Sequence, residues 1–546
     1  MPDLLRIPDC FIWRIEQGAC ARDNWRMAVA TAKRRGALAD LTAARFENTF
    51  VHELPADPVL VNMPRQVANA CYTRVEPTSV AKPTLLAWSD AMGELLGLSR
   101  PSSDTVDVLA GNRVLPGMAP YAARYGGHQF GHWAGQLGDG RAITLAEIVA
   151  TDGSRQELQL KGAGKTPYSR TADGRAVLRS SLREFMCSEA MFHLGVPTTR
   201  ALSLVGTGED VIRDMFYDGH PRPEPGAIVC RVAPSFVRFG NFQIHAANNE
   251  LDARKRLVDY ILKYHYSGHS PASWFQELCR RTALLMVDWM RLGFVHGVMN
   301  TDNMSILGVT IDYGPYGWLE GYDPMWTPNT TDAMGRRYSY GNQPGIAQWN
   351  LARLAEALLP LIERQPLEEG LNLYADTFNS GWRAALAAKI GLAESEPGDD
   401  ELTRDLLVAL TETETDFTLF FRRLAQVPLA ASGEALLAPL MPAFYADGAS
   451  HERLVAWLER YVARARKEAA SRVQRMNAVN PKYVFRNYLA QQAIDALEAG
   501  DRAPLERLMR ILERPYDEQP EFEEFAARRP EWARNKAGCS ALSCSS

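Results

Sequence analysis

Residues 294–307 read Phe-Val-His-Gly-Val-Met-Asn-Thr-Asp-Asn-Met-Ser-Ile-Leu, and residues 309–314 read Val-Thr-Ile-Asp-Tyr-Gly. A helical repeat of apolar residues precedes this stretch and leads to Gly293, a residue type that often ends helices. The repeat consists of Trp274, Phe275, Leu278, Leu285, Met286, Trp289 and Leu292. The order predicts a long buried helix that ends at Gly293 and is followed by a loop rich in polar side chains.

The spacing within this loop is that of a protein-kinase catalytic loop with one change. Such a loop has a base Asp two residues after its His and a metal-binding Asn seven residues after it, and a second metal-binding Asp opens an Asp-aromatic-Gly motif. Asn303 lies seven residues after His296, and Asp312 begins Asp-Tyr-Gly. Val298 stands at the base position and cannot accept a proton. The sequence therefore predicts a nucleotide and metal site without the usual base, with Asp302 as the available carboxylate.

A lysine and a glutamate upstream fit the same comparison. Alternating polar and apolar residues at 157–161 predict a strand that ends at Lys161. Glu184 lies 23 residues later (184 − 161), in a helix expected to begin near Ser180. A strand lysine paired with a helix glutamate holds nucleotide phosphates in kinases. The alternative is a capping box, in which Ser181 and Glu184 only cap their own helix.

A glycine-rich stretch and two arginines are further candidates for phosphate binding. Six glycines fall at positions 126, 127, 131, 135, 138 and 140. Glycine lets backbone N–H groups approach an anion, but the same residues also suit tight turns of a small sheet. Arg231 and Arg238 flank an apolar run, and guanidinium groups bind phosphate in pairs of hydrogen bonds. The alternative to phosphate binding is that Arg231 and Arg238 are two ordinary surface arginines. Asp173-Gly174-Arg175 is typical of a turn.

Composition excludes several other classes of protein. The 546 residues contain 60 Lys+Arg and 65 Asp+Glu, which gives a net charge of −5, and 46% of them are hydrophobic. A nucleic-acid binder would usually carry a strong basic excess, so no nucleic-acid partner is expected. No apolar run approaches the roughly 18 residues needed to span a bilayer, so no membrane partner is expected.

Eight thinly spread cysteines without a C-x-x-C motif are typical of reduced thiols. The N-terminus lacks the pattern of a signal peptide. We therefore expect a cytoplasmic location if the source is bacterial, and a mitochondrial one if it is eukaryotic. Acidic residues within positions 1–40 weaken the interpretation of that segment as a transit peptide.

A β-rich part of the chain followed by a helical part suggests an α+β fold with two lobes. Residues 1–40 form an N-terminal extension of unknown use. A β-rich nucleotide-binding region is expected at 41–245, and a helical region with the catalytic loop and metal site at 246–470. Residues 471–546 are expected to form a helical segment and a cysteine-containing tail.

Five motifs together resemble the selenoprotein O family, and the match runs from about residue 41 to the C-terminus. They are Tyr-Gly-Gly-His-Gln-Phe-Gly (125–131), Leu-Lys-Gly-Ala-Gly (160–164), Ala-Pro-Ser-Phe-Val-Arg-Phe-Gly (233–240), His-Gly-Val-Met-Asn-Thr-Asp-Asn-Met-Ser (296–305) and Ile-Asp-Tyr-Gly-Pro (311–315). The resemblance implies a kinase-like pseudokinase fold. It also implies transfer of AMP from ATP to Ser, Thr or Tyr hydroxyls of other proteins, with release of pyrophosphate and dependence on Mg²⁺ or Mn²⁺. Transfer of UMP from UTP is implied for some members, and the nucleotide is implied to lie flipped relative to a kinase.

The resemblance also assigns residues by position. It implies Asp302 as the proton acceptor, Asn303 and Asp312 as metal ligands, and Glu184 as the residue that orients Lys161. The implied ATP contacts are Gly138, Gly140, Arg141, Lys161, Asp173, Gly174, Arg231, Arg238 and Asp312.

The redox role of the C-terminal tail stays open at this point, and so do two alternative functions of the protein. Some relatives carry selenocysteine third from the end, where Cys544 stands, and certain bacterial members pair a tail cysteine with one beyond Asp-Tyr-Gly. The stretch 323–329 contains no cysteine here. A redox pair of Cys539 and Cys544 is the remaining hypothesis. The alternative functions are a protein kinase with a displaced base and a non-catalytic ATP-binding scaffold.

Overall fold

The computed structural model describes residues 38–215, 218–445 and 451–543. Most of the N-terminal segment 1–40 therefore lies outside the described residues, and so does Cys544.

A seven-stranded sheet with β7 at its centre organises the first part of the chain. Neighbouring strands are antiparallel, in the order β1-β3-β6-β7-β9-β8-β2. The strands are β1 (Tyr72–Arg74), β2 (Thr84–Trp88), β3 (Tyr121–Ala123), β6 (Ala142–Val149), β7 (Arg155–Lys161), β8 (Arg200–Arg213) and β9 (Arg222–Ala233). Two short pairs lie outside it: β4 (Gly126–Gln129) with β5 (His132–Gln136), and β10 (Phe294–Val295) with β11 (Gly317–Trp318). The predicted strand at 157–161 is confirmed as β7, which begins two residues earlier.

The two faces of β7 differ because successive side chains point to opposite sides of a strand. Leu158 and Leu160 pack into an apolar core with residues of α3 and α4. Glu157, Gln159 and Lys161 occupy the opposite face, where α5 covers the sheet and Lys161 contacts Glu184 of that helix. The strand therefore brings its polar face to the interior of the molecule rather than to solvent.

Helices are the main regular structure in the rest of the described chain. Those before and beside the sheet are α2 (Thr49–Glu53), α3 (Asp90–Leu96), α4 (Ser103–Leu109) and α5 (Leu178–His193). Those that follow it are α6 (Phe239–Ala247), α7 (Leu251–Tyr264), α8 (Pro271–Leu292), α9 (Gln343–Leu358), α10 (Arg364–Lys389), α11 (Asp399–Glu412), α12 (Phe417–Leu424), α13 (Glu452–Ala465), α14 (Arg472–Val479), α15 (Asn487–Glu498) and α16 (Ala503–Leu512).

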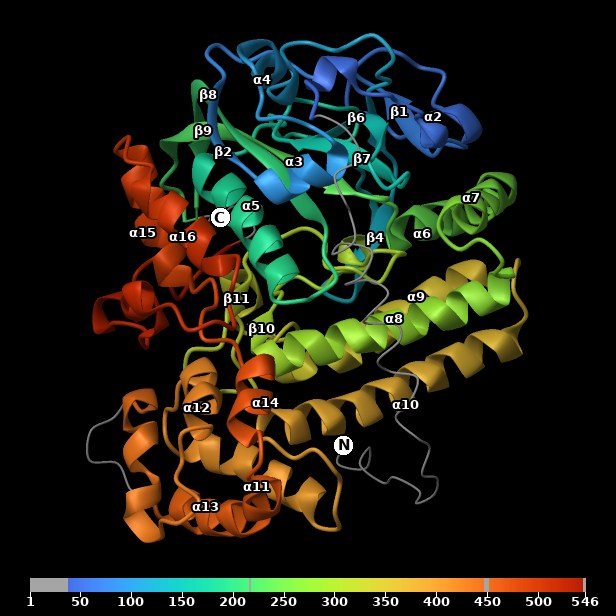
Figure 1. Cartoon of the computed structure of the whole chain (residues 1–546). Helices are drawn as coiled ribbons and strands as arrows, with labels where there is room; N and C mark the ends of the chain where they lie inside the picture. The colour runs from blue at the N-terminus through green and yellow to red at the C-terminus, as the bar shows by residue number, and fades with distance from the viewer. Residues whose placement is uncertain (1–37, 216–217, 446–450, 544–546) are drawn as a thin grey trace.

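Helix α8 confirms the prediction made from its apolar repeat. Ser270 caps its first turn, Pro271 is the first helical residue, and Gly293 ends the helix with a left-handed φ of 71°. All seven residues of the predicted stripe are buried. Helix α8 packs against α10. The residues that follow Gly293 at its C-terminal end, 294–307, are called the polar loop, and they lie below the sheet in Figure 1.

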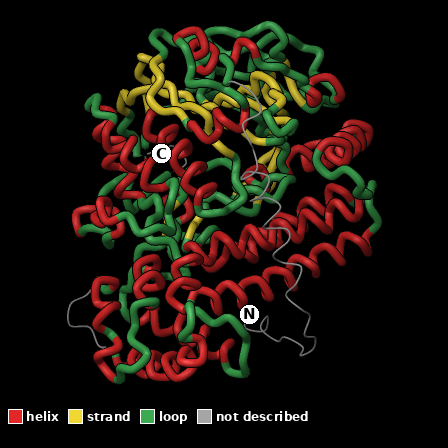
Figure 2. Tube along the Cα trace, viewed as in Figure 1, coloured by secondary structure: helices red, strands yellow, loops and turns green. Residues whose placement is uncertain are grey.

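The sheet lies at the top of Figure 1, α8, α9 and α10 cross the middle, and α11 to α14 lie at the bottom. Figure 2 shows the same division, with the strands gathered in the upper part and helices dominating below. The chain thus combines a β-sheet with many helices, which confirms that part of the expected fold class. Among the described residues, no helix has the length and apolar character needed to cross a membrane.

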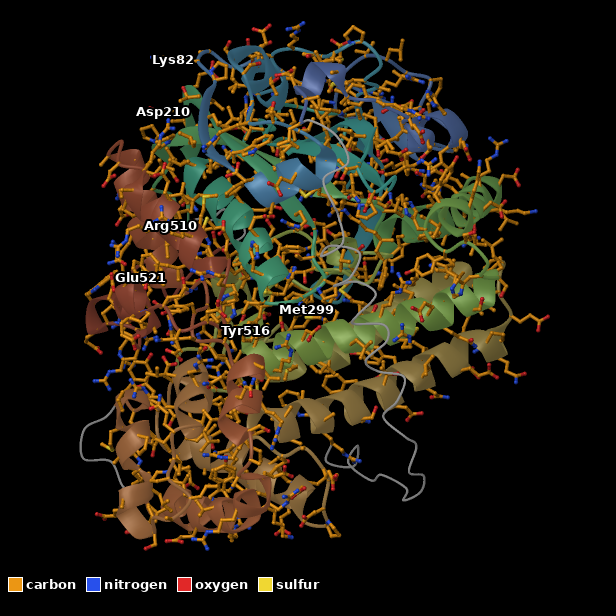
Figure 3. All side chains as sticks on the ribbon, viewed as in Figure 1. Lys82, Asp210, Met299, Arg510, Tyr516 and Glu521 are labelled. Atoms are coloured by element: carbon orange, nitrogen blue, oxygen red, sulfur yellow. The ribbon has the colours of Figure 1, made fainter. Side chains whose placement is uncertain are left out.

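The C-terminal segment returns to helix α5 and to the stretch 328–330. Helices α15 and α16 contact α5, and Tyr516, labelled in Figure 3, donates a hydrogen bond to the carbonyl of Leu194 at the end of α5 (2.9 Å). Further along, Leu542 pairs with the stretch around Asn329: its N–H donates to Pro328 O (3.0 Å), and its carbonyl accepts from Thr330 N (2.8 Å).

Candidate functional site

A cavity of about 660 Å³ lies between the sheet and the polar loop. Glycine turns, cationic side chains and the residues after β10 surround it. Its lining includes Gly138, Gly140, Arg141, Lys161, Arg170, Asp173, Gly174, Arg175, Arg213, Arg231, Arg238, Val298, Asn303 and Asp312. Every ATP contact implied by the family resemblance is in this set. The structure thus brings together residues from positions 138 to 312.

Lys161 and Glu184 form an ion pair at the floor of the cavity. The Lys161 ammonium lies 2.5 Å from one oxygen of Glu184, and Arg231 Nη1 lies 3.1 Å from the other. Helix α5 begins at Leu178 after Val177, and no side chain caps it. The capping-box alternative is therefore wrong, because Glu184 lies two turns inside the helix and its carboxylate turns toward the sheet.

Two buried arginines enclose Asp312. Arg231 donates to Asp312 Oδ1 and Arg238 donates to Asp312 Oδ2. Both guanidinium groups are buried, so the surface-arginine alternative is wrong. Burial alone would raise the pKa of Asp312, but Arg238 and Arg231 lower it well below its usual range. Asp312 is therefore a fixed negative charge, and it adopts a left-handed φ of 61° at the start of Asp-Tyr-Gly.

The cavity carries an excess of positive charge. Beside Lys161 and the two buried arginines, its wall includes Arg141, Arg170, Arg175 and Arg213. Arg213 forms a pair of 2.7 Å hydrogen bonds with Asp173, whose carboxylate also accepts from Arg175 N in the expected turn. Closely spaced cations in a partly enclosed space favour a polyanion such as a triphosphate.

The polar loop presents Asn303 to the cavity and keeps Asp302 beside it. His296 is fully buried, stacks on Trp289 and contacts the Ile311 carbonyl (2.9 Å), so it supports the loop. Asn303 Nδ2 donates to Val298 O (2.9 Å), which leaves Asn303 Oδ1 as an oxygen donor for a ligand. Met299 of this loop, labelled in Figure 3, lies above α8 near the middle of the view.

Asp302 is 7% exposed and is not among the residues that line the cavity. Its Oδ2 accepts a hydrogen bond from Gln129 Nε2 (3.2 Å), whereas its buried Oδ1 has no hydrogen-bond partner among the described residues. Burial raises the pKa of Asp302 to about 6, against the opposing effect of the Gln129 hydrogen bond. A carboxylate with a raised pKa is suited to proton transfer near neutral pH.

The side chains of Asn303 and Asp312 have the chemistry to hold Mg²⁺ or Mn²⁺. Both offer hard oxygen donors, and Mg²⁺ usually binds to one or two protein ligands together with substrate phosphates. Within the described ranges, no group of three or more His, Cys, Asp or Glu side chains is placed to hold a metal by itself. The donor set therefore fits a cation that arrives with a phosphate ligand.

The glycine-rich stretch divides into two parts, of which only the second lines the cavity. Gly138 and Gly140 line the cavity, as the phosphate-binding interpretation expects. The first four glycines belong to the β4–β5 hairpin or its turn, which packs on the polar loop instead. The turn interpretation therefore holds for that part. Other lining residues, such as Arg170 and Arg213, carried no motif and could not be found from spacing.

The Cys539 thiol is buried and forms no disulfide with another described residue, and burial raises its pKa to about 11. Its hypothetical partner, Cys544, lies outside the described residues. The pairing of these two cysteines stays a prediction.

Closely spaced cations next to a pair of oxygen donors are typical of enzymes that use nucleotides. Comparison with known proteins identifies the family to which this enzyme class belongs here. The family model described as "Protein adenylyltransferase SelO" matches residues 60–513, and the chain belongs to this family of protein nucleotidyltransferases. The resemblance seen in the sequence is thereby confirmed.

Similar proteins of full length carry a consistent name. A protein from Nitrosospira multiformis is 62% identical over 93% of this chain and 98% of its own length. Relatives from an Azoarcus species (58% identical, 92% and 99% covered) and from Rhodopirellula baltica (55%, 93% and 99%) are comparable. All three are called "Protein nucleotidyltransferase YdiU".

Proposed function

We propose that this chain transfers AMP from ATP to a Ser, Thr or Tyr hydroxyl of another protein and releases pyrophosphate. The observation that carries the proposal is the pairing of a strongly cationic cavity with a loop that has Val298 where a kinase has its base. The proposed setting is the bacterial cytoplasm, with ATP and acceptor proteins as partners.

A kinase-like, two-lobed fold is part of this proposal. An antiparallel sheet carries the lysine, the helix beneath it carries the paired glutamate, and the polar loop and Asp-Tyr-Gly follow a long helix. This chain order is the kinase order. The cavity between sheet and loop is the corresponding nucleotide cleft.

In the proposed reaction the cationic side chains bind the phosphates and orient the α-phosphorus. Lys161, Arg231 and Arg238 neutralise the triphosphate, and Glu184 holds Lys161 in place. Asn303 and Asp312 would hold one or two Mg²⁺ or Mn²⁺ ions, which supply further charge neutralisation at the phosphates. Arg231 and Arg238 must then exchange part of their contact with Asp312 for contact with phosphate oxygens.

Asp302 takes the acceptor proton. The acceptor oxygen bonds to the α-phosphorus, the bond from that phosphorus to the bridging oxygen of the β-phosphate breaks, and pyrophosphate leaves. The hydroxyl proton passes to the Asp302 carboxylate. Because Asp302 lies outside the phosphate-binding wall, its removal should affect transfer far more than ATP binding.

Labelled ATP tests the proposal directly. Protein acceptors incubated with the enzyme should gain label from α-³²P-ATP and none from γ-³²P-ATP. Label from the γ position would instead identify a kinase, and absence of both labels with retained ATP binding would identify a scaffold. The Asp302→Ala variant should lose transfer by about 10²-fold or more while its ATP affinity stays within about two-fold. Parallel reactions with α-³²P-UTP test the proposed UMP transfer.

A further inference from the structure

The β4–β5 hairpin, residues 126–136, has no role in the nucleotide cavity described above. It carries most of the Tyr-Gly-Gly-His-Gln-Phe-Gly motif, yet none of its residues lines the cavity. Its contacts lie instead with the polar loop at Asn300, Thr301 and Asp302. The hairpin therefore contacts the proposed proton acceptor, Asp302, without lining the nucleotide cavity.

The hairpin is attached to three consecutive residues of the loop. His128 N donates to Thr301 Oγ1 (2.7 Å), whose hydroxyl donates to Gln243 Oε1 (2.6 Å). Phe130 N donates to Tyr338 Oη (2.8 Å), and that hydroxyl donates to Asn300 Oδ1 (2.6 Å). Between these two anchors, the Gln129 side chain donates to Asp302. The anchors fix the backbone on both sides of Gln129, so its amide is held in place over the carboxylate.

The environment of Asp302 is asymmetric between its two oxygens. Oδ2 accepts from Gln129 Nε2, whereas Oδ1 has no partner within the described ranges. Gly127 lies against Oδ1, and a Cβ at position 127 would stand 2.4 Å from that oxygen. Buried carboxylate oxygens are normally hydrogen-bonded, and a catalytic role is one explanation for an unpartnered one. A glycine at position 127 is what allows the hairpin to pack this closely on the carboxylate.

We infer that Gln129 is a positioning residue, which holds the Asp302 carboxylate by Oδ2 in the orientation that proton transfer from the acceptor requires. The inference rests on the proposed function, because it assigns a partner to the proposed proton acceptor. Gln129 touches neither nucleotide nor acceptor and acts only through Asp302. Loss of its hydrogen bond frees the carboxylate to rotate, and misplacement of a reacting group by about 1 Å can cost about 10²-fold in rate.

Gln129→Met removes the hydrogen bond and keeps the length of the side chain. It should lower kcat for AMP transfer by about 10- to 100-fold and leave the KM for ATP within about two-fold. Gln136→Met is the matched control from the same hairpin, since Gln136 bonds the backbone of Arg65 and Val67 rather than the loop. It should keep the kcat of the unchanged enzyme. Gln129→Asn, whose amide is too short to reach, serves as a second variant if the Met variant does not fold.

A double-mutant cycle separates positioning from general structural damage. In the Asp302→Ala background, Gln129→Met should lower the residual transfer rate by less than about two-fold, because its target is gone. The inference is overturned by an unchanged kcat in Gln129→Met, or by an equal loss in both backgrounds. Failure of the unchanged enzyme to transfer α-label would contradict the proposed function itself, so the two failures are distinguishable.

Discussion

Arg238 links the two carboxylate-bearing segments of the site. Its guanidinium contacts the side chain of Asp312 and donates a 2.9 Å hydrogen bond to the backbone carbonyl of Asp302. The same arginine lies over the ring of Tyr125, 4.7 Å from its centroid. One buried side chain therefore connects the proposed metal ligand, the backbone of the proposed proton acceptor and the start of the glycine-rich motif.

Metal and ATP should bind cooperatively, because Arg231 and Arg238, which we propose bind the phosphates, are both engaged with Asp312. A cation that takes over Asp312 releases them for the phosphates. Calorimetric titration with ATP should show at least about a tenfold weaker affinity in EDTA than in Mg²⁺ or Mn²⁺, a coupling of about 1.4 kcal/mol. Asp312→Ala should abolish the difference between the two conditions. Asp210→Ala should leave it intact, because Asp210 (labelled in Figure 3) is an exposed residue of β8 that does not line the cavity.

Replacing Lys161 by Met should lower kcat/KM for ATP by about 10- to 100-fold, since one phosphate-facing cation is lost. Glu184 keeps its contact with Arg231, so the fold should persist. Lys165→Met is the matched control, because Lys165 is exposed four residues further on. Steady-state transfer of α-label with varied ATP measures both variants. Equal rates for Lys161→Met and Lys165→Met would remove Lys161 from the phosphate site.

Ala at position 127 should damage transfer without damaging ATP binding. The added Cβ would lie 2.4 Å from Asp302 Oδ1 and within 2.9 Å of its Cβ, so the carboxylate or the hairpin must move. We expect kcat to fall by about 10²-fold. Gly153→Ala is a suitable comparison for an added methyl group, because no atom lies within 4 Å of the new Cβ, although its φ of 84° adds backbone strain. Normal turnover by Gly127→Ala would show that the contact is easily relieved.

Glu157 should make stability fall as the pH rises. Burial, with a contribution from Glu147, raises the pKa of Glu157 from 4.5 to about 8. Between these values the folded protein holds a proton that the unfolded chain has released, so each rise in pH favours unfolding. From pH 6 to pH 8 the loss is at most about 2.7 kcal/mol. The melting temperature of Glu157→Gln should therefore fall less over this range than that of the unchanged protein, and parallel curves would contradict the raised pKa.

Local patterns predicted the elements whose partners lie nearby in the chain. The apolar stripe gave α8 and its end at Gly293, and alternation gave β7 with Lys161 as its last residue. The family resemblance placed Lys161, Arg231 and Asp312 in one site, and the cavity contains all three. In these cases spacing along the chain translates directly into position on a helix or strand.

Patterns with two physical meanings were harder to interpret. Glycine serves both an anion-binding turn and a tight hairpin, so composition could not show that the stretch divides near Gly135 and Gly138. The Ser181 and Glu184 spacing matched a capping box, although the Glu184 carboxylate instead contacts Lys161 at the end of β7. Gln129 lies in a family motif that assigned it no role, and Arg213 lies in no motif. Their partners, Asp302 and Asp173, are distant in sequence, so spacing could not reveal the contacts.

The pairing of Leu542 with Pro328 and Thr330 has a consequence for biosynthesis. Asn329, within the paired stretch, donates a 3.0 Å hydrogen bond to the carbonyl of Gly297, next to Val298 in the cavity wall. Residue 542 is translated long after the stretch that it pairs with, so this support of the loop forms only once synthesis has passed Leu542. A nascent chain that has not reached Leu542 therefore lacks the finished site, although all the residues that line the cavity have already been made.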